Sequence, residues 1–230
     1  MGRALGVNLD EDFEYFYVDN GSGPAELTES VSAQKIESFR VKLPEQLLNY
    51  WKLYGWSCYG NGLCWWVDPD LYTPVLDTWL EGTPFAGRTI FSVIGRSAFG
   101  LLYVWGTRSS QSLKIDAASG MIFPSDESEA ISAGRSDALA RYFFLTLHKQ
   151  VLDEEDLNGK PLYERAIKAL GALASDEMYG FEPALALGGE ARLKNLRRVK
   201  TVEHLALLAK LGGKKVMRDI VRDTRLSNKS

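Results

Sequence analysis

Four short runs of strand-forming residues follow one another between residues 89 and 123. The runs are TIFSVIG (89–95), LLYVW (101–105), SLKI (112–115) and MIF (121–123). Parallel neighbours need a crossover of a dozen or more residues, whereas antiparallel neighbours need only a short turn. The short spacing therefore predicts an antiparallel meander and excludes a doubly wound parallel sheet.

A helix, a strand and a second helix are expected before the meander. The first helix opens near Pro44 and ends at Gly55, because apolar and aromatic residues recur along one face between these two signals. The aromatic-rich run LCWWV (63–67) follows the loop WSCYGNG and predicts a buried strand. Thr73 and Pro74 are expected to open the second helix. Together these elements predict an α+β fold in which helices flank the antiparallel sheet.

A second, mostly helical α+β portion is expected to pack on the first. The polar stretch PSDESEAISAGRS (124–136) separates the two, which predicts domains at residues 1–125 and 135–230. Helices are expected from Ser136 to about Gln150, from Pro161, and from Thr201, and a basic amphipathic helix from about Val216. MYGF (178–181) predicts a strand, because Gly180 within it and Pro183 after it disfavour a helix.

Charge is distributed unevenly along the 230 residues. Residues 1–150 carry 12 Lys and Arg against 18 Asp and Glu, whereas residues 151–230 carry 15 against 12. Nucleic acid phosphates favour Lys and Arg, so the acidic first part disfavours nucleic acid and suits a basic partner. A solvated surface without any steering role explains so modest an imbalance equally well.

Cysteine content and hydropathy exclude several classes of protein. The two cysteines, Cys58 and Cys64, are too few for a disulfide framework or a four-ligand zinc site. The N-terminal segment has no apolar core of signal-peptide length, and the longest apolar runs are far shorter than the ~20 residues that a bilayer span needs. We therefore expect a cytoplasmic protein without a membrane segment or a cofactor.

Candidate nucleophiles, metal ligands and phosphate loops all depart from their motifs. Ser97 lies in GRSAFG, which is one residue too long for a nucleophile elbow and joins two expected strands. His148 and His204 fall on different helices, where a lone histidine is more often packed than ligating. GSG and GNG lack the residues that a phosphate-binding loop requires. The sequence therefore predicts no enzyme.

The stretch DEMYGFEPALALGG (176–189) contains carboxylates that could form an acid/base pair. On a strand, however, Glu177 and Glu182 point to opposite faces. A two-carboxylate mechanism needs a pair that converges on one bond, roughly 5 to 10 Å apart. A structural element is therefore the better interpretation of this stretch.

Seven aromatic residues lie between residues 50 and 66, and at most half of them can point into one core. Exposed Trp and Tyr would suit a protein interface or base stacking, although no Lys or Arg lies between Gly55 and Gly87. Core packing with chance exposure accounts for the cluster equally well. The predicted partner contacts are three loop residues and three carboxylates: Trp56, Tyr59, Asn61, Asp68, Asp70 and Glu81.

Two long runs carry a resemblance to known domains. LPEQLLNYWKLYGWSCYGNGLCWWVDPDLYTPVLDTWL, with RSAFGLLYVW after it, resembles the GAD-like domain. DEMYGFEPALALGGEARLKNLRRVKTVEHLALLAKL is similar to the domain of unknown function that often follows it. In this order the two domains resemble the immunity proteins paired with DNase toxins of the type VI secretion system.

This resemblance implies a non-enzymatic inhibitor that protects the producing bacterium from its own toxin. A DNase presents a basic cleft to DNA, and an acidic surface with aromatic anchors could occlude it. We therefore expect a monomer that forms a one-to-one complex with the cognate DNase.

Two other functions stay open. A nucleic-acid-binding module would use exposed aromatics and the basic C-terminal helix, and the distant link of GAD domains to tRNA synthetase inserts supports this alternative. A hydrolase would use Glu177, Glu182 or Ser97.

Overall fold

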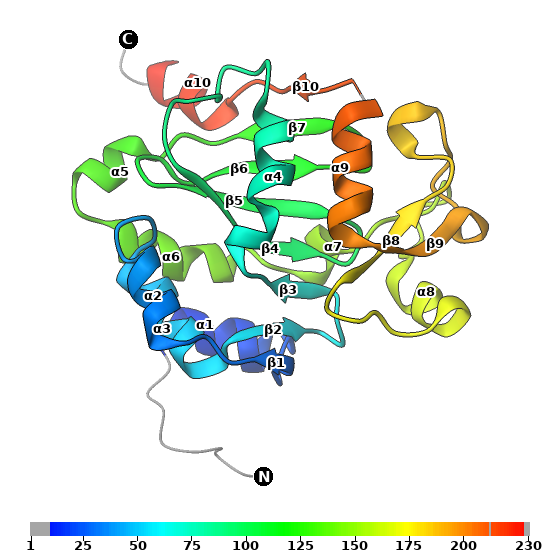
Figure 1. Cartoon of the computed structure of the whole chain (residues 1–230), viewed down its shortest axis with the longest axis horizontal. Coiled ribbons are helices and arrows are strands. Elements are labelled where there is room, and N and C mark those ends of the chain that lie inside the picture. Colours follow the sequence, from blue (N-terminus) through cyan, green and yellow to red (C-terminus); the bar gives the residue numbers. More distant parts are fainter. Residues whose placement is uncertain (1–9, 212, 228–230) are drawn as a thin grey trace.

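The computed structural model describes residues 10–211 and 213–227, and its centre is an eight-stranded sheet (Figure 1). In sheet order the strands are β1 (Glu26–Glu29), β2 (Trp56–Tyr59), β3 (Cys64–Trp66), β4 (Phe91–Ser97), β5 (Leu101–Gly106), β6 (Ser110–Asp116), β7 (Met121–Pro124) and β10 (Lys215–Val216). Neighbours are antiparallel from β1 to β7, and β10 pairs parallel with β7. The predicted meander is therefore confirmed as β4 to β7.

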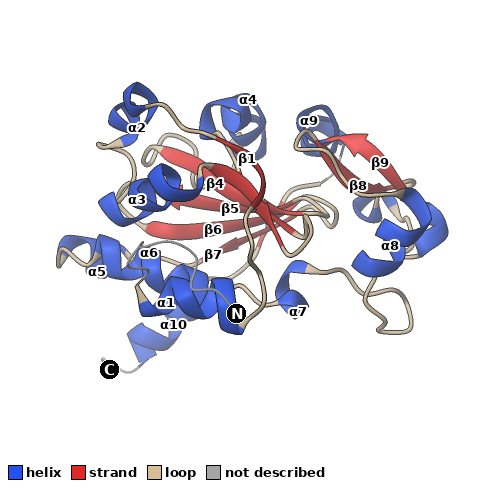
Figure 2. Cartoon of the chain, turned by 90° about the horizontal axis from the view of Figure 1, so that it is seen from below, coloured by secondary structure: helices blue, strands red, loops and turns tan. Residues whose placement is uncertain are grey.

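Helices cover both faces of this sheet. Figure 2 shows α4 (Pro69–Leu80) and α9 (Thr201–Leu211) on one face, and α1 (Glu11–Glu14) and α6 (Ser136–Leu145) on the other. The remaining helices of the first portion are a π-helical turn (Tyr15–Asp19), α2 (Ala33–Phe39), α3 (Glu45–Tyr54) and α5 (Ser128–Ser132). Because both faces are covered, β4 and β5 are buried throughout except at their first residues.

A smaller unit lies at one side of the molecule, next to the main sheet (Figure 1). It contains the antiparallel pair β8 (Glu177–Phe181) and β9 (Leu196–Lys200), with α7 (Lys149–Leu152), α8 (Tyr163–Leu170) and 3-10 turns at Leu185–Leu187 and Leu193–Asn195. The chain then returns to the main sheet through α9 and β10 and continues into α10 (Ile220–Ser227). The domain division at residues 125–135 stays a prediction. Three elements that come after it in the chain, α6, α9 and β10, pack on the main sheet of the first portion.

Local signals explain where the helices begin and end. Gly55 ends α3 as predicted, with φ of 63°, and a Cβ atom there would lie 2.2 Å from the carbonyl oxygen of Glu29. The predicted start of the next helix at Thr73 is wrong, because α4 begins at Pro69 and encloses Pro74. Asp68 caps α4 by accepting a hydrogen bond from the Asp70 N–H at 3.0 Å. An Asp cap followed directly by proline is the stronger start signal.

Three further expectations from the sequence need correction. The helix expected from Ser136 to Gln150 ends at Leu145, and α7 follows separately. The terminal helix expected from Val216 begins at Ile220, because the preceding residues form β10. The segment before LCWWV is a strand, β2, rather than a loop.

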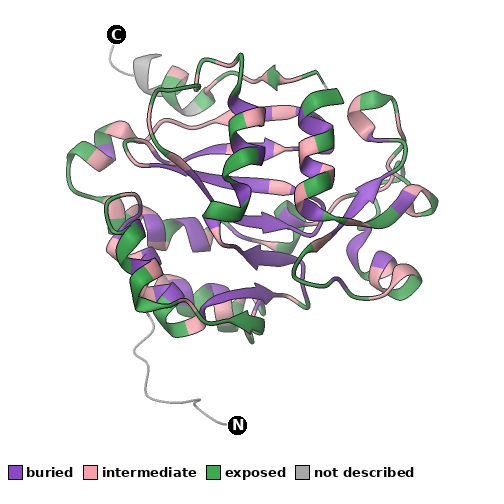
Figure 3. Cartoon of the chain, viewed as in Figure 1, coloured by how far each residue is buried: buried purple, intermediate pink, exposed green. Residues whose placement is uncertain are grey.

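The aromatic cluster between residues 50 and 66 is almost entirely buried, which contradicts the expectation that about half of it is exposed. Six of its seven side chains are at most 9% exposed, and Tyr54 alone is half-buried. The expectation assumed one core, whereas helices cover both faces of this sheet, so side chains that alternate along β2 and β3 enter packed layers on either side. Figure 3 shows β2 to β5 as mostly buried and the outward faces of α4 and α9 as exposed.

Candidate partner-binding site

The predicted loop residues do not form an exposed aromatic surface. Trp56 and Tyr59 lie in β2 with 9% and 1% of their surface exposed, packed against Trp51 and Phe16. The expectation that these two rings face solvent is wrong. Asn61 is exposed in the turn between β2 and β3, where its carbonyl oxygen accepts a hydrogen bond from the Tyr163 hydroxyl at 2.6 Å. This turn therefore helps to hold the second portion in place.

The three predicted carboxylates all belong to α4 or its caps. Asp68 is the N-cap and Glu81 is the C-cap, so they lie at opposite ends of the helix. The ammonium group of Lys35 lies 2.9 Å from the Asp68 carboxylate and 2.6 Å from that of Asp70. Lys35 therefore offsets one of the two negative charges of Asp68 and Asp70.

Asp77, a carboxylate that was not predicted, lies on the same side of α4 as Asp70 and Glu81. These residues are separated by seven and then four positions, and such spacings place side chains on one face of a helix. Asp77 and Glu81 are exposed, and neither side chain forms an ion pair with another described residue. The sequence prediction missed Asp77, although the helical spacing of the acidic residues was a signal that could have found it.

This row of carboxylates borders a groove of about 610 Å³ between α4 and residues 85–92. Lys42 is the one cation among the described residues that line it, against three carboxylates. The apolar lining comes from both walls and includes Phe39, Leu76, Phe85, Ile90 and Phe91. Ile90 is 54% exposed, so the groove offers an accessible apolar side chain beside its acidic row.

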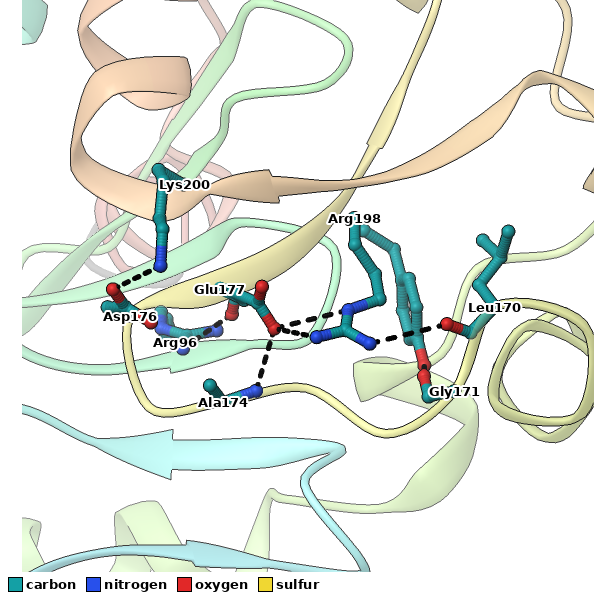
Figure 4. Close-up of polar contacts among 9 residues, drawn as sticks. Arg96, Leu170, Gly171, Ala174, Asp176, Glu177, Arg198 and Lys200 are labelled. Atoms are coloured by element: carbon teal, nitrogen blue, oxygen red, sulfur yellow. Dashed lines mark hydrogen bonds and ion pairs between the residues drawn. The ribbon is translucent and has the colours of Figure 1, made fainter.

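A second charged surface lies on the pair β8 and β9, and Figure 4 shows the contacts of Asp176 and Glu177 within it. Glu177 binds Arg198 across the strands at 2.6 Å, and Asp176 binds Lys200 at 2.5 Å. Glu182 lies 3.8 Å from Arg197, which completes a third pair. The exposed cations of β9 are thus matched by carboxylates from β8 and its flanks.

Glu177 and Glu182 do not form an acid/base pair, because each binds a different arginine of β9. The Glu177 carboxylate also accepts a hydrogen bond from the Ala174 N–H at 3.0 Å. That bond, opposed by burial and reinforced by Arg198, holds the pKa of Glu177 below its usual value. This carboxyl is therefore kept ionised and hydrogen-bonded, which does not suit a proton donor.

Arg96 of β4 lies directly beneath this surface and is fully buried (Figure 4). Its guanidinium group donates to the carbonyl oxygens of Ser175 at 3.0 Å and Glu177 at 2.9 Å, and to the Tyr72 hydroxyl at 3.1 Å. It also lies over the ring of Trp65, 4.8 Å from the centroid. Arg96 thus joins the main sheet to β8. Sequence reasoning considered only its neighbour, Ser97.

The candidate nucleophile occupies a structural position, and His148 and His204 are both half-buried. Ser97 is 1% exposed, and its hydroxyl oxygen accepts hydrogen bonds from the N–H groups of Phe99 and Leu101, both at 3.2 Å. Burial lowers the pKa of His204. Among the described residues there is no group of three or more His, Cys, Asp or Glu side chains that could hold a metal ion.

Comparison with known families gives a match for each portion of the fold. A family model of the GAD-like domain matches residues 13–119, and one described as "T6SS immunity protein Tdi1, C-terminal" matches residues 138–212. The chain therefore belongs to the family of type VI secretion immunity proteins in which a GAD-like domain precedes the Tdi1 C-terminal domain. This membership supports a general function in type VI immunity and implies a toxin as the partner.

A solved structure confirms the fold class. The crystal structure of Atu4351 from Agrobacterium tumefaciens is similar to this chain with a TM-score of 0.77 and 21% sequence identity over 90% of both chains. At this identity the similarity concerns the fold alone. Comparison with curated proteins gives no match. No helix within the described ranges is long and apolar enough to cross a membrane.

Proposed function

We propose that this protein is a cytoplasmic immunity protein that inhibits the DNase domain of a cognate type VI toxin. In this proposal it performs no catalysis, forms a one-to-one complex, and covers the DNA-binding cleft of the toxin with the groove beside α4. The family membership supports the immunity function. The acidic groove is the observation that carries the choice of a DNA-cleaving partner.

Charge complementarity supports this docking surface. A cleft that binds DNA must present cations to the phosphates, so the same cations can meet carboxylates. Asp77 and Glu81 have no ion-pair partner among the described residues, so no internal bond has to break before they contact a toxin. Their field also accelerates association with a basic partner at low salt.

Apolar side chains beside the carboxylates would supply the remaining binding energy. Binding hot spots are well-packed, desolvated side chains near the centre of an interface. Ile90 is exposed in the groove, and Phe85 is half-buried there. Of the contacts expected from the sequence, Asp70 and Glu81 belong to this surface. Trp56, Tyr59 and Asn61 do not line it.

Co-expression with a candidate toxin nuclease encoded by a neighbouring gene tests the proposal. We expect the two proteins to purify together in a one-to-one ratio, and DNA cleavage to cease when they are mixed. Failure to bind that nuclease would remove the proposal. Occlusion further requires that DNA and this protein compete for the toxin. A ternary complex that holds DNA without cutting it would instead indicate an allosteric route.

The nucleic-acid-binding alternative receives less support. The exposed cations of β9 that would contact phosphates are paired with Asp176, Glu177 and Glu182. Arg218, which precedes α10, likewise pairs with Asp223 at 2.8 Å. A gel shift with RNA and DNA at low salt tests the alternative, and a strong, salt-sensitive shift would favour it over the immunity proposal.

A further inference from the structure

A second cavity, of about 380 Å³, lies on the other side of the segment that precedes β4. Its walls come from residues 84–91, the turn between β5 and β6, residues 124–128 and the start of α10. Phe85 and Phe91 line both this cavity and the acidic groove. The acidic residues of the groove do not line it, so the two hollows differ in their chemistry.

Arginines give this cavity a cationic lining. Arg88, Arg108 and Arg222 approach it from three separate segments, against two carboxylates, those of Asp126 and Asp219. Arg88 and Arg108 form no ion pair with another described residue. Arginine presents several N–H donors in a fixed plane, which suits a phosphate group better than a single-point cation does.

The two carboxylates are engaged by the backbone around them. Asp219 accepts hydrogen bonds from the N–H groups of Asp126 and Arg222, both at 2.9 Å. Asp126 accepts one from the Ser128 N–H at 2.9 Å. Burial opposes ionisation of Asp126, but the Ser128 bond and the nearby charges of Arg222 and Arg88 hold its pKa below the usual value. These carboxylates fix the walls and would repel a bare anion that offers no hydrogen-bond donor.

The rest of the lining is apolar or carries hydroxyl groups. The rings of Phe85 and Phe91 meet edge to face, with centroids 6.5 Å apart. Ser109 and Ser112 hydrogen-bond to each other at 2.7 Å. Aromatic side chains bind flat rings by stacking or edge contacts, and hydroxyl groups can bind the polar edges of a ligand.

We propose that this cavity binds a small molecule that joins an aromatic ring to a phosphate, which is the chemistry of a mononucleotide. Its volume falls within the ~300–1,000 Å³ range of small-molecule sites. The phosphate contacts Arg88 and Arg108, the ring packs on the phenylalanine wall, and sugar hydroxyl groups donate to the carboxylates. The inference does not depend on the immunity function, because the arginines that it uses lie outside the acidic groove, although the two hollows share Phe85 and Phe91.

Isothermal titration calorimetry of the full chain with AMP tests this inference. We expect AMP to bind, and ribose 5-phosphate, adenosine and inorganic phosphate each to bind at least about tenfold more weakly. Equal binding of inorganic phosphate would overturn the role of the ring, and equal binding of adenosine would overturn that of the arginines. Absence of AMP binding at millimolar concentration would overturn the proposal. Tighter binding of the free amino acid phenylalanine, which has a ring and no phosphate, would also overturn it.

Two variants and a matched control locate the site. Arg88→Gln and Arg108→Gln should each weaken AMP binding at least about tenfold, whereas Arg135→Gln, at an exposed arginine outside the cavity, should not. Unchanged melting temperatures confirm that the variants fold. Binding of AMP to the first two variants at wild-type affinity would contradict the assignment. Toxin inhibition by Arg108→Gln should be unchanged, which separates this inference from the proposed function.

Discussion

The β8–β9 pair and helix α4 both present rows of carboxylates, but only the first row is matched by cations of the same chain. Across β8 and β9, each acidic side chain meets an arginine or a lysine. Along α4, Lys35 pairs with both carboxylates at the N-terminal end, while Asp77 and Glu81 have no ion-pair partner among the described residues. Acidic side chains that the fold leaves without a cation are the ones available to a basic partner.

The two regions should therefore respond differently to mutation. Changes at the less exposed contacts of β8–β9, namely Glu177 and the arginine beneath it, should lower the free energy of unfolding and leave toxin affinity intact. Changes along α4 should lower toxin affinity and leave the free energy of unfolding intact. A mutation that altered both quantities equally in either region would break this distinction.

The largest effect is expected from Arg96→Ala. The substitution leaves the buried carbonyl oxygens of Ser175 and Glu177 without their donor and creates a cavity beside Trp65. We expect the free energy of unfolding to fall by about 3–5 kcal/mol, as measured by urea denaturation. Arg135→Ala, at an exposed position, is the control. A loss below about 1 kcal/mol would show that Arg96 does not hold β8 to the sheet.

Charge reversal on α4 should produce the next largest effect, on affinity alone. We expect Asp77→Lys combined with Glu81→Lys to weaken toxin binding on the order of 100-fold, because like charges then face each other across the interface. Glu155→Lys with Glu164→Lys changes the net charge equally near α8 and serves as the control. Surface plasmon resonance provides the affinities. Equal losses for both double variants would indicate that net charge, rather than the groove, determines binding.

A smaller effect on stability is expected from Glu177→Gln. The substitution weakens the contacts to Arg198 and to the Ala174 N–H, and should cost about 1 kcal/mol at neutral pH. Because the pKa of Glu177 is lowered in the folded state, its carboxylate stabilises the fold above the usual value of 4.5 and loses this contribution as the pH falls through the lowered pKa. The variant should therefore show a shallower loss of stability below about pH 4.5. A pH profile identical to that of the wild type would contradict the contribution of the Glu177 carboxylate to stability.

The smallest effect is expected from Asp176→Asn. The ion pair with Lys200 is more than half exposed on both sides, with side-chain exposures of 63% and 56%. Exposed pairs gain little because water and salt screen them. Urea denaturation should give the wild-type midpoint within experimental error. A clear loss of stability would show that this pair is coupled to Arg96 beneath it.

Local signals made much of the fold predictable from the sequence. The short turns between β4 and β7 leave antiparallel pairing as the available arrangement, and Gly55 marks the end of α3. β10 could not be predicted, because it is two residues long and its partner strand lies about ninety positions earlier in the chain. The burial of Trp56 and Tyr59 depends on helices that cover both faces of the sheet. The alternation of side chains along β2 does not show whether one face or both are covered.

The candidate site was predictable only in part. Asp70 and Glu81 could be selected as acidic residues in a segment without cations, and the spacing of Asp77 carries the same information. Arg96 could not be recognised, because its partners are backbone carbonyl oxygens about eighty residues away. The ion pairs of Lys35 with Asp68 and Asp70 could not be recognised either, because these residues are far apart in the sequence and meet only in the folded protein.

Hydrogen–deuterium exchange of the toxin complex tests most directly whether the unmatched carboxylates of α4 form the partner surface. We expect toxin binding to slow amide exchange in residues 70–92, while exchange in residues 176–200 is the same in the free and bound protein. Protection confined to residues 176–200, with residues 70–92 unchanged, would contradict it.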